Sequence, residues 1–303
     1  MRPPDDFHPP IGKAETLDPG LRRIVAPNPS PMTFRGTNTY LLGTTEIAVI
    51  DPGPLDTDHL DAILDALTPD QQITHILVSH AHLDHSPLAR PLQEKCGAAI
   101  YGFGPAEKGR SKVMQRLAAN GMVGGGEGID STFVPDHELM DGEVVTGKDW
   151  QLRALHTPGH IGNHICLAWQ DVCFTADHVM GWASSLVSPP DGDLTDFMAS
   201  CRRLLKHPWR RFYPGHGDIV HDPNARLDWL IAHRLGREAA ILDALHRGPA
   251  DALSLARMIY GDTPASLMPA AARNVLAHLI DLIGKNKVMP LAPLGADTRF
   301  RLA

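Results

Sequence analysis

The sequence predicts an α/β protein in which helices cover the faces of sheets, followed by a smaller and mostly helical C-terminal part. Up to about residue 223, short apolar runs typical of buried strands alternate with amphipathic stretches typical of helices, as in sheets covered by helices. From residue 224 onward the pattern is mainly helical. We therefore expect one domain over residues 1–223 and a second over residues 224–303.

Two segments of the first part illustrate the reasoning. Residues 73–78 are a continuous apolar run, which suits a strand that is covered on both faces. Thr57 can cap a helix whose apolar positions keep to one face. The further elements predicted here are strands over 39–42, 47–50 and 98–101 and a helix over 87–94.

The C-terminal part has three helical patterns followed by a tail that reads as a hairpin. The helices are predicted over residues 225–245, 254–259 and 270–283. Gly284 and the polar residues after it end the last helix before the apolar Val288-Met289-Pro290.

The segment after the apolar run at 73–79 carries His80, His82, Asp84 and His85 within six residues. Imidazole and carboxylate are the ligands that zinc and similar metals take in proteins. In a strand, alternate side chains face the same way, so His80 and His82 can reach one ion together. If the chain turns into a helix after His82, Asp84 and His85 can reach a second ion beside the first. The segment therefore predicts half of a two-metal site.

The other half is expected where further apolar runs end in polar residues. At each of these places Gly or Pro allows the chain to turn sharply. His160 follows the run at 150–156, Asp177 follows the run at 171–176, and His216 follows the run at 211–215.

These motifs resemble the metallo-β-lactamase superfamily, whose pattern is HxHxDH followed by single His, Asp and His ligands. Residues 28–43 and 50–54 and the C-terminal tail resemble the lactamase-β-2-like branch, which ends in a winged-helix-like domain. The resemblance implies an αββα sandwich with metals at one edge between the sheets. It further implies a first metal held by His80, His82 and His160, a second held by Asp84, His85 and His216, and Asp177 bridging both.

The resemblance implies a hydrolase with two divalent ions, zinc first, with manganese or iron as alternatives. A hydroxide bridging two such ions is the expected nucleophile. Asp84 is expected to orient it, so Asp84 and Asp177 are the predicted catalytic residues. The bond cleaved is left open among ester, thioester, lactone and amide.

Two other activities stay open. One is an endoribonuclease or phosphodiesterase of the lactamase-β-2 type. The other is a mononuclear iron persulfide dioxygenase, which would use only His80, His160 and Asp177. A complete set of residues for a second metal speaks against the dioxygenase.

Residues outside the ligand set carry weaker predictions. Trp182 and Ser184 follow the bridging Asp177 closely and are predicted to contact substrate. His164 and His178 are read as non-ligands that could orient a ligand, as metal sites usually require. Asp51 is read as structural. The irregular stretch 102–135 is either a lid with cations for an anionic substrate or an exposed loop.

Charge and composition limit the kinds of partner that this protein is expected to bind. The net charge of -7 argues against a surface built for nucleic acid or anionic lipid. From Arg234 onward nine basic and six acidic residues leave a net +3, so nucleic-acid binding stays open but is not favoured. A small-molecule substrate is expected, and a homodimer is left open. No apolar run could span a bilayer and no secretory signal is seen, so a cytoplasmic protein is expected.

Overall fold

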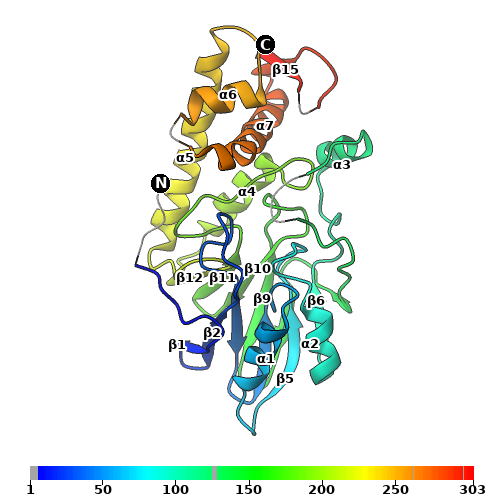
Figure 1. Ribbon diagram of the computed structural model, residues 1–303, viewed down its shortest axis with the longest axis vertical. Coiled ribbons are helices and arrows are strands. Elements are labelled where there is room, and N and C mark those ends of the chain that lie inside the picture. Colours follow the sequence, from blue (N-terminus) through cyan, green and yellow to red (C-terminus); the bar gives the residue numbers. More distant parts are fainter. Residues whose placement is uncertain (1–5, 125–127, 262, 296) are drawn as a thin grey trace.

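Two β-sheets packed face to face make up the body of the molecule (Figure 1). The computed structural model describes residues 6–124, 128–261, 263–295 and 297–303. The first sheet holds, in order, β1 (Glu15–Asp18), β2 (Leu21–Val25), β3 (Asn38–Leu42), β4 (Glu46–Ile50), β5 (Gln72–Leu77), β6 (Ala99–Gly102) and β7 (His137–Glu138). The second holds β12 (Arg211–Pro214), β11 (Val172–Ala176), β10 (Ile165–Trp169), β9 (Gln151–His156) and β8 (Val144–Thr146).

The inner faces of the two sheets meet in one apolar core. Tyr40 of β3 packs edge-to-face on Phe174 of β11, with ring centroids 5.1 Å apart. Ile50, Leu152 and other side chains of the same faces are buried beside them. The alternation of strand side chains puts these residues inward, and burial of their apolar area is the main force joining the sheets.

Helices cover the two outer faces, which completes four layers. On the first sheet lie α1 (Thr57–Asp65) and α2 (Ala89–Cys96), whose apolar residues join its outer core. On the second lie α4 (Leu194–Leu204) and the first half of α5 (Pro223–Leu245). The predicted αββα sandwich is confirmed.

The carboxyl ends of the central strands lie at one edge of this sandwich. In the first sheet β4 and β5 are parallel. In the second, β11 is parallel to β12, and β9 runs the same way because β10 is antiparallel to both neighbours. Asn38 joins the two sheets at this edge, since its side-chain amide donates to the carbonyls of Pro214 and Gly217 at 2.9 Å.

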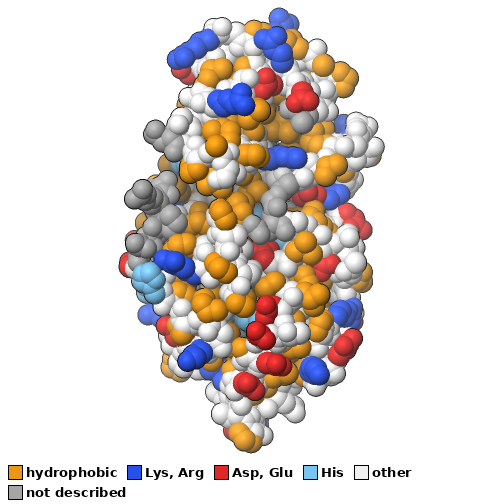
Figure 2. Space-filling model, viewed as in Figure 1, with side chains coloured by type: hydrophobic (Ala, Val, Ile, Leu, Met, Phe, Trp, Pro, Cys, Tyr) orange, Lys and Arg blue, Asp and Glu red, His pale blue; other side chains and the backbone are white. Residues whose placement is uncertain are grey.

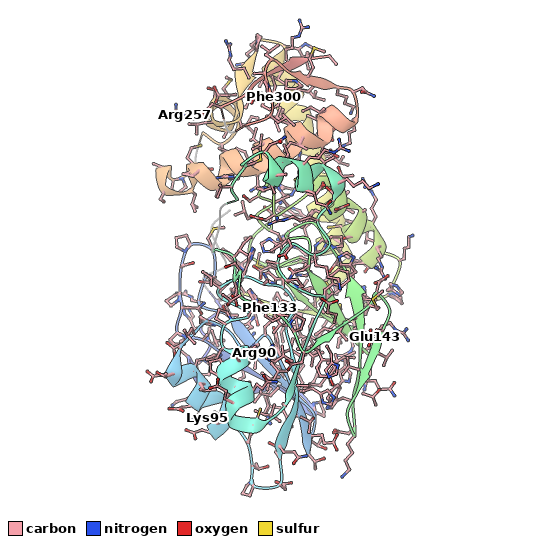
Figure 3. The ribbon with its side chains drawn as sticks, turned by 90° about the vertical axis from the view of Figure 1, so that its right-hand side faces the viewer. Arg90, Lys95, Phe133, Glu143, Arg257 and Phe300 are labelled. Atoms are coloured by element: carbon pink, nitrogen blue, oxygen red, sulfur yellow. The ribbon has the colours of Figure 1, made fainter. Side chains whose placement is uncertain are left out.

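The C-terminal elements form a second body above that edge (Figure 1). A core that includes fully buried Phe300 joins α5 to the elements after it (Figure 3). The helix α3 (Lys112–Ala119) adds Met114 and Leu117 to this same core. The later elements are β13 (Ala250–Asp251), α6 (Ala252–Ile259), a short 3-10 helix (Ala265–Leu267), α7 (Met268–Gly284), β14 (Val288–Pro290) and β15 (Arg299–Leu302).

One local prediction was wrong. The N-cap of α1 is Asp56, whose carboxylate accepts from the amide of His59 at 2.7 Å, so Thr57 is already helical. The helix predicted over residues 87–94 is present as α2 with a shift of two residues, and residues 83–88 before it form turns. Within the described residues, no helix is both long and apolar enough to cross a membrane.

Candidate metal centre

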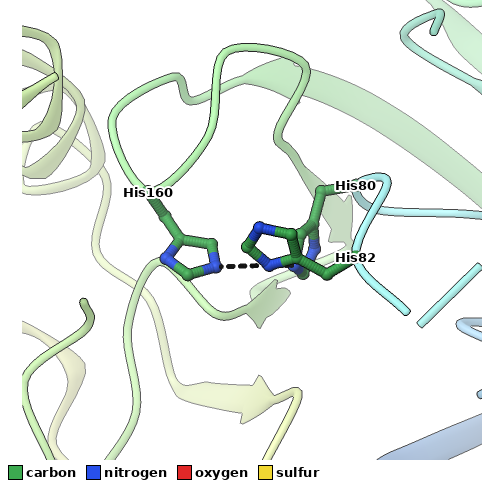
Figure 4. A group of neighbouring side chains, drawn as sticks. All are labelled: His80, His82 and His160. Atoms are coloured by element: carbon green, nitrogen blue, oxygen red, sulfur yellow. Dashed lines mark hydrogen bonds between the residues drawn. The ribbon is translucent and has the colours of Figure 1, made fainter. Parts of the chain in front are cut away.

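Three histidines converge at the sheet edge, and we call them the three-histidine group: His80, His82 and His160 (Figure 4). His82 Nδ1 lies 3.0 Å from His80 Nε2 and 3.0 Å from His160 Nε2. A neutral imidazole carries a proton on only one ring nitrogen, so three nitrogens this close present several lone pairs to one point. A cation at that point would satisfy all three.

A second set beside it, the acid-rich group, consists of Asp84, His85, Asp177 and His216. One donor atom from each lies within 4.8 Å of the others, and all four residues are buried. His216 Nε2 is 3.1 Å from Asp84 Oδ2, and His85 Nε2 is 3.4 Å from Asp177 Oδ1.

Asp177 faces both groups. Its Oδ1 lies 3.3 Å from His216 Nε2, whereas its Oδ2 lies 3.6 Å from His160 Nε2. A carboxylate placed this way offers one oxygen to each group. The structure therefore brings together all seven side chains that the sequence singled out as ligands.

The donor atoms fit a divalent cation. Both carboxylate oxygens of Asp84 and Oδ1 of Asp177 are buried and, among the described residues, receive no hydrogen bond of good geometry. The approach of His216 to Asp84 is an ion-pair distance without that geometry. Buried carboxylate oxygens that lack hydrogen bonds are costly. Imidazole nitrogen and carboxylate oxygen are ligands that zinc, manganese and iron accept.

The two groups differ in their electrostatics. Burial, and then the neighbouring His160, lower the pKa of His82 to about 3. Burial likewise holds the pKa of His80 well below its usual range. Burial opposes the charge of His216 too, but Asp177 and Asp84 outweigh it and raise that pKa to about 10. The pKa of His85 is raised for the same reason by Asp84, Asp177 and Asp51.

Asp51 connects the two groups from behind. Its Oδ1 accepts from the Ser79 amide and its Oδ2 from the Ser79 hydroxyl, both at 2.7 Å. His85 Nδ1 lies 3.1 Å from the same Oδ2, and the Ser79 hydroxyl lies 2.9 Å from His80 Nδ1. Such contacts orient an imidazole and set which nitrogen faces a metal. The structural role expected for Asp51 is thus that of a support for His80 and His85.

Two further imidazoles are oriented by backbone carbonyls. His160 Nδ1 lies 2.7 Å from the Leu186 carbonyl, and His216 Nδ1 lies 3.2 Å from the Gly36 carbonyl. Each contact leaves Nε2 to face its group.

His164 and His178 do not hydrogen-bond any of the seven residues in the described structure. His164 Nδ1 is 2.9 Å from the Thr157 hydroxyl, and its ring lies 5.1 Å from that of His80. His178 Nε2 is 3.5 Å from Cys201 Sγ. Both rings are buried and pack behind the three-histidine group. They shape its wall rather than orient a ligand by hydrogen bonding.

Gly215 is needed for close approach at the acid-rich group. A Cβ at this position would lie 2.5 Å from Asp177 Oδ1 and 2.7 Å from His85 Cε1. Both distances are too short for any side chain. The bend that brings His216 to the site is therefore restricted to glycine.

A cavity of about 1170 Å³ opens from the metal-facing residues toward the C-terminal body. His82, His160 and Asp177 line one end of it. Trp182 and Ser184 also line it, so they are placed where a substrate could touch them. Their role as substrate contacts stays a prediction.

Two cations of the suggested lid at residues 102–135 are paired with carboxylates. Lys108 pairs with Glu138 at 2.5 Å, and Arg110, which lines the cavity, pairs with Asp191. The helix α3 is anchored in the C-terminal core. The glycine-rich part of the suggested lid at 125–127 lies outside the described residues.

Sequence reasoning missed the far wall of the cavity. Trp229, His233 and Arg237 of α5, Tyr260 after α6 and Asn274 of α7 all line it. The signal was present as the spacing of Trp229, His233 and Arg237 along one helix. Nothing in the sequence said that this helix face meets the cavity.

Residues 32–216 match the family profile described as the metallo-beta-lactamase superfamily, and residues 252–289 match the beta-lactamase associated winged helix domain. The chain therefore belongs to the metallo-β-lactamase superfamily. The predicted family, the fold with its winged helix, and the class of metal-dependent hydrolase are confirmed.

Curated relatives support this assignment. The chain is 31% identical over 284 residues to the beta-lactamase-like protein 2 homolog of Drosophila melanogaster, covering 90% of each chain. It is 30% identical over 246 residues to the atrochrysone carboxyl ACP thioesterase of Cryptosporiopsis sp. (strain 8999), covering 79% of this chain and 67% of that protein.

Solved structures agree in fold. A beta-lactamase domain protein from Burkholderia ambifaria superposes with a TM-score of 0.81 at 21% identity, over 100% of this chain and 97% of that one. A metallo-beta-lactamase family protein from Thermus thermophilus superposes with a TM-score of 0.75 at 26% identity, over 95% of this chain and 100% of that one.

Proposed function

We propose that this chain is a dinuclear, zinc-dependent hydrolase that cleaves thioester bonds. The observation that carries the two-metal part is the pair of adjacent donor groups with Asp177 between them. The thioester is favoured over the ester, lactone and amide because several relatives are named acyl carrier protein thioesterases. We further propose residues 1–223 as the catalytic domain and residues 224–303 as the domain that completes the cavity.

The chemistry is hydrolysis. When bound, two divalent ions would polarise the thioester carbonyl and lower the pKa of the attacking water. The acyl carbon gains the hydroxyl of that water, the carbon–sulfur bond breaks, and the thiol leaves with a proton.

The residues have separate roles in this proposal. His80, His82 and His160 would hold one ion and Asp84, His85 and His216 the other, with Asp177 shared. Asp84 stays ionised, because His85 and His216 outweigh the effect of burial and lower its pKa to about 2. Its carboxylate can therefore accept a hydrogen bond from the attacking water and orient it.

The two alternatives make different demands. A mononuclear iron dioxygenase would use Asp177 but leave Asp84, His85 and His216 without a function. A nuclease would need cations along a nucleic-acid path. In the described C-terminal body, Lys285 and Lys287 both form ion pairs with Glu238. Arg257 is the single basic residue of α6. Neither alternative is favoured.

Metal content and a substrate panel test the proposal together. Protein purified without chelator is analysed for metal, then given thioesters, lactones, amides and RNA. We expect about two zinc ions per chain and turnover of thioesters, abolished in Asp84→Ala. One iron per chain, or RNA cleavage without thioester hydrolysis, would refute it.

A further inference from the structure

A row of stacked side chains runs along the face of α5 that meets the cavity. The Arg226 guanidinium lies 4.3 Å from the centroid of the Trp229 ring, and the Trp229 and His233 rings are stacked with centroids 4.9 Å apart. One turn further along, Arg237 lies 4.3 Å from the centroid of Tyr260. Residues three and four apart share a helix face, so these groups form one continuous surface, which we call the α5 stripe.

The α5 stripe and the metal-facing residues belong to the same cavity. Trp229, His233, Arg237 and Tyr260 line one part of it, while His82 and Asp177 line another. Apolar side chains, including Met32, Met122, Ile129, Leu186 and Leu267, line the space as well. Hydrophobic side chains gather on the face where the C-terminal helices meet the body (Figure 2).

The size of this space points to a large substrate. At about 1170 Å³ the cavity exceeds the usual range of small-molecule pockets, roughly 300–1,000 Å³. A short acyl group would fill only a small fraction of it. The polar amides of a carrier thiol arm would gain little from its aromatic and aliphatic walls.

Arg237 differs from the other arginine that lines the cavity. Arg110 is paired with Asp191. Arg237 has no carboxylate partner among the described residues, and its one hydrogen bond is to the Ile259 carbonyl at 3.4 Å. Its neighbour His233 is neutral at pH 7, because burial and then the adjacent arginines lower its pKa to about 4. The positive charge at this end of the cavity therefore comes from Arg237.

We propose that the α5 stripe is the acyl subsite of this hydrolase, and that it takes a flat aromatic acyl group with a carboxylate at the end remote from the thioester. The ring packs against Trp229 and Tyr260, and the remote carboxylate pairs with Arg237. This inference rests on the proposed thioester hydrolysis. Aromatic walls favour a flat ring, and an unpaired, half-buried guanidinium favours a planar carboxylate.

A single-stranded RNA would also suit stacked rings and an arginine. It would, however, bring several phosphates, and the cavity presents one cation that is not already paired within the described residues. A single remote carboxylate matches that charge. RNA is therefore kept as an outcome of the test.

The test compares two thioesters of the same thiol, N-acetylcysteamine, on the zinc-loaded full chain. One acyl group is naphthoyl, and the other is naphthoyl bearing a free carboxylate on the far ring. We expect kcat/KM to be about ten- to hundred-fold higher for the carboxylated thioester, as a charge-assisted hydrogen bond supplies. Arg237→Gln should abolish this preference, and Arg237→Lys should restore part of it.

Arg257→Gln is the matched control. Arg257 is exposed on α6, on the outside of the C-terminal body, and does not line the cavity (Figure 3). The Arg257→Gln variant should keep the wild-type preference for the carboxylated thioester. Equal kcat/KM for the two thioesters in the wild type, or an unchanged preference in Arg237→Gln, would overturn the subsite.

Direct binding separates failure of the subsite from failure of the proposed function. Calorimetry with the free naphthalene dicarboxylate and with naphthoate needs no turnover. Tighter binding of the dicarboxylate that is lost in Arg237→Gln supports the subsite even if no thioester is cleaved. Equal binding of both acids, or tighter binding of an oligonucleotide that depends on Arg237, refutes it.

Discussion

The three-histidine group and the acid-rich group lie side by side but carry different charges before any cation binds. In the first, burial lowers the pKa of His80 and His82, so both imidazoles are neutral and ready to donate lone pairs. In the second, two buried carboxylates raise the pKa of His85 and His216. The three-histidine group therefore offers unprotonated imidazole nitrogens to a cation. In the acid-rich group, protons on His85 and His216 occupy the nitrogens that a cation would use.

Because of this difference, a metal ion competes with protons at the acid-rich group but not at His80 and His82. A metal entering the three-histidine group displaces no proton from His80 or His82. A metal entering the acid-rich group must displace the protons that compensate Asp84 and Asp177. The two groups should therefore respond differently to pH and to substitution.

Removing the residue shared by both groups should have the largest effect. In Asp177→Ala we expect hydrolysis to fall by more than about a hundred-fold, the upper end of what loss of a metal's supporting partner costs. Metal content should drop in both groups, as measured by elemental analysis. Asp171→Ala, an exposed aspartate paired with Arg210, is the control. Retained full activity in Asp177→Ala would refute the shared role.

Gly215→Ala should damage the acid-rich group and spare the other. The added Cβ would press on Asp177 Oδ1 and His85 Cε1. We expect loss of one metal per chain before the second, together with a lower melting temperature.

Gly236→Ala is the matched control for that substitution. Gly236 lies in α5, and a Cβ added there would meet no atom within 4 Å beyond the backbone of its own helix. Alanine there should stabilise the helix by roughly 1 kcal/mol, with metal content unchanged. Two bound metals in Gly215→Ala would contradict the close-packing argument.

Asp51→Asn should weaken the acid-rich group by a smaller factor. Asn tolerates the positive φ of 50° at this position, so the backbone should be kept. The lost charge beside His85 is expected to reduce metal affinity there by about ten- to hundred-fold. Competition with a chromogenic chelator measures it. Equal weakening of both metals would mean that Ser79 carries the effect to His80.

Metal removal should make stability depend on pH in the metal-free protein. The folded-state pKa of His216 is about 10 against an ordinary 6.5. The stability from its proton is thus fully present below pH 6.5 and is lost as the pH rises through about 10. Thermal melts of chelator-treated protein should show this loss.

The metal-loaded protein should lack that loss, because the cation replaces the proton. Zinc titration of the metal-free protein at pH 8, in buffers of different ionisation enthalpy, should also release protons. Zinc binding without proton release would remove the distinction between the two groups.

Much of the fold could be read from local pattern. The continuous apolar run at 73–78 became β5, and the long amphipathic pattern at 225–245 became α5. Errors arose where side-chain hydrogen bonds compete, as at the cap of α1, where Asp56 rather than Thr57 accepts from the helix. Asp84 and His85 reach the second group from a segment of turns at residues 83–88, and no helix directly after His82 is needed for this.

The sequence by itself determined the residue types of the metal centre, since ligand chemistry is tied to side-chain identity and each candidate stands at the end of an apolar run. Only the tertiary structure decided which atoms converge. His82 presents Nδ1 rather than Nε2, and Asp177 turns one oxygen to each group. The α5 stripe likewise lines the cavity only because the C-terminal body packs above the sheet edge. Its helix follows the last motif residue, His216, closely in the chain, but only packing decides which face of that helix lines the cavity.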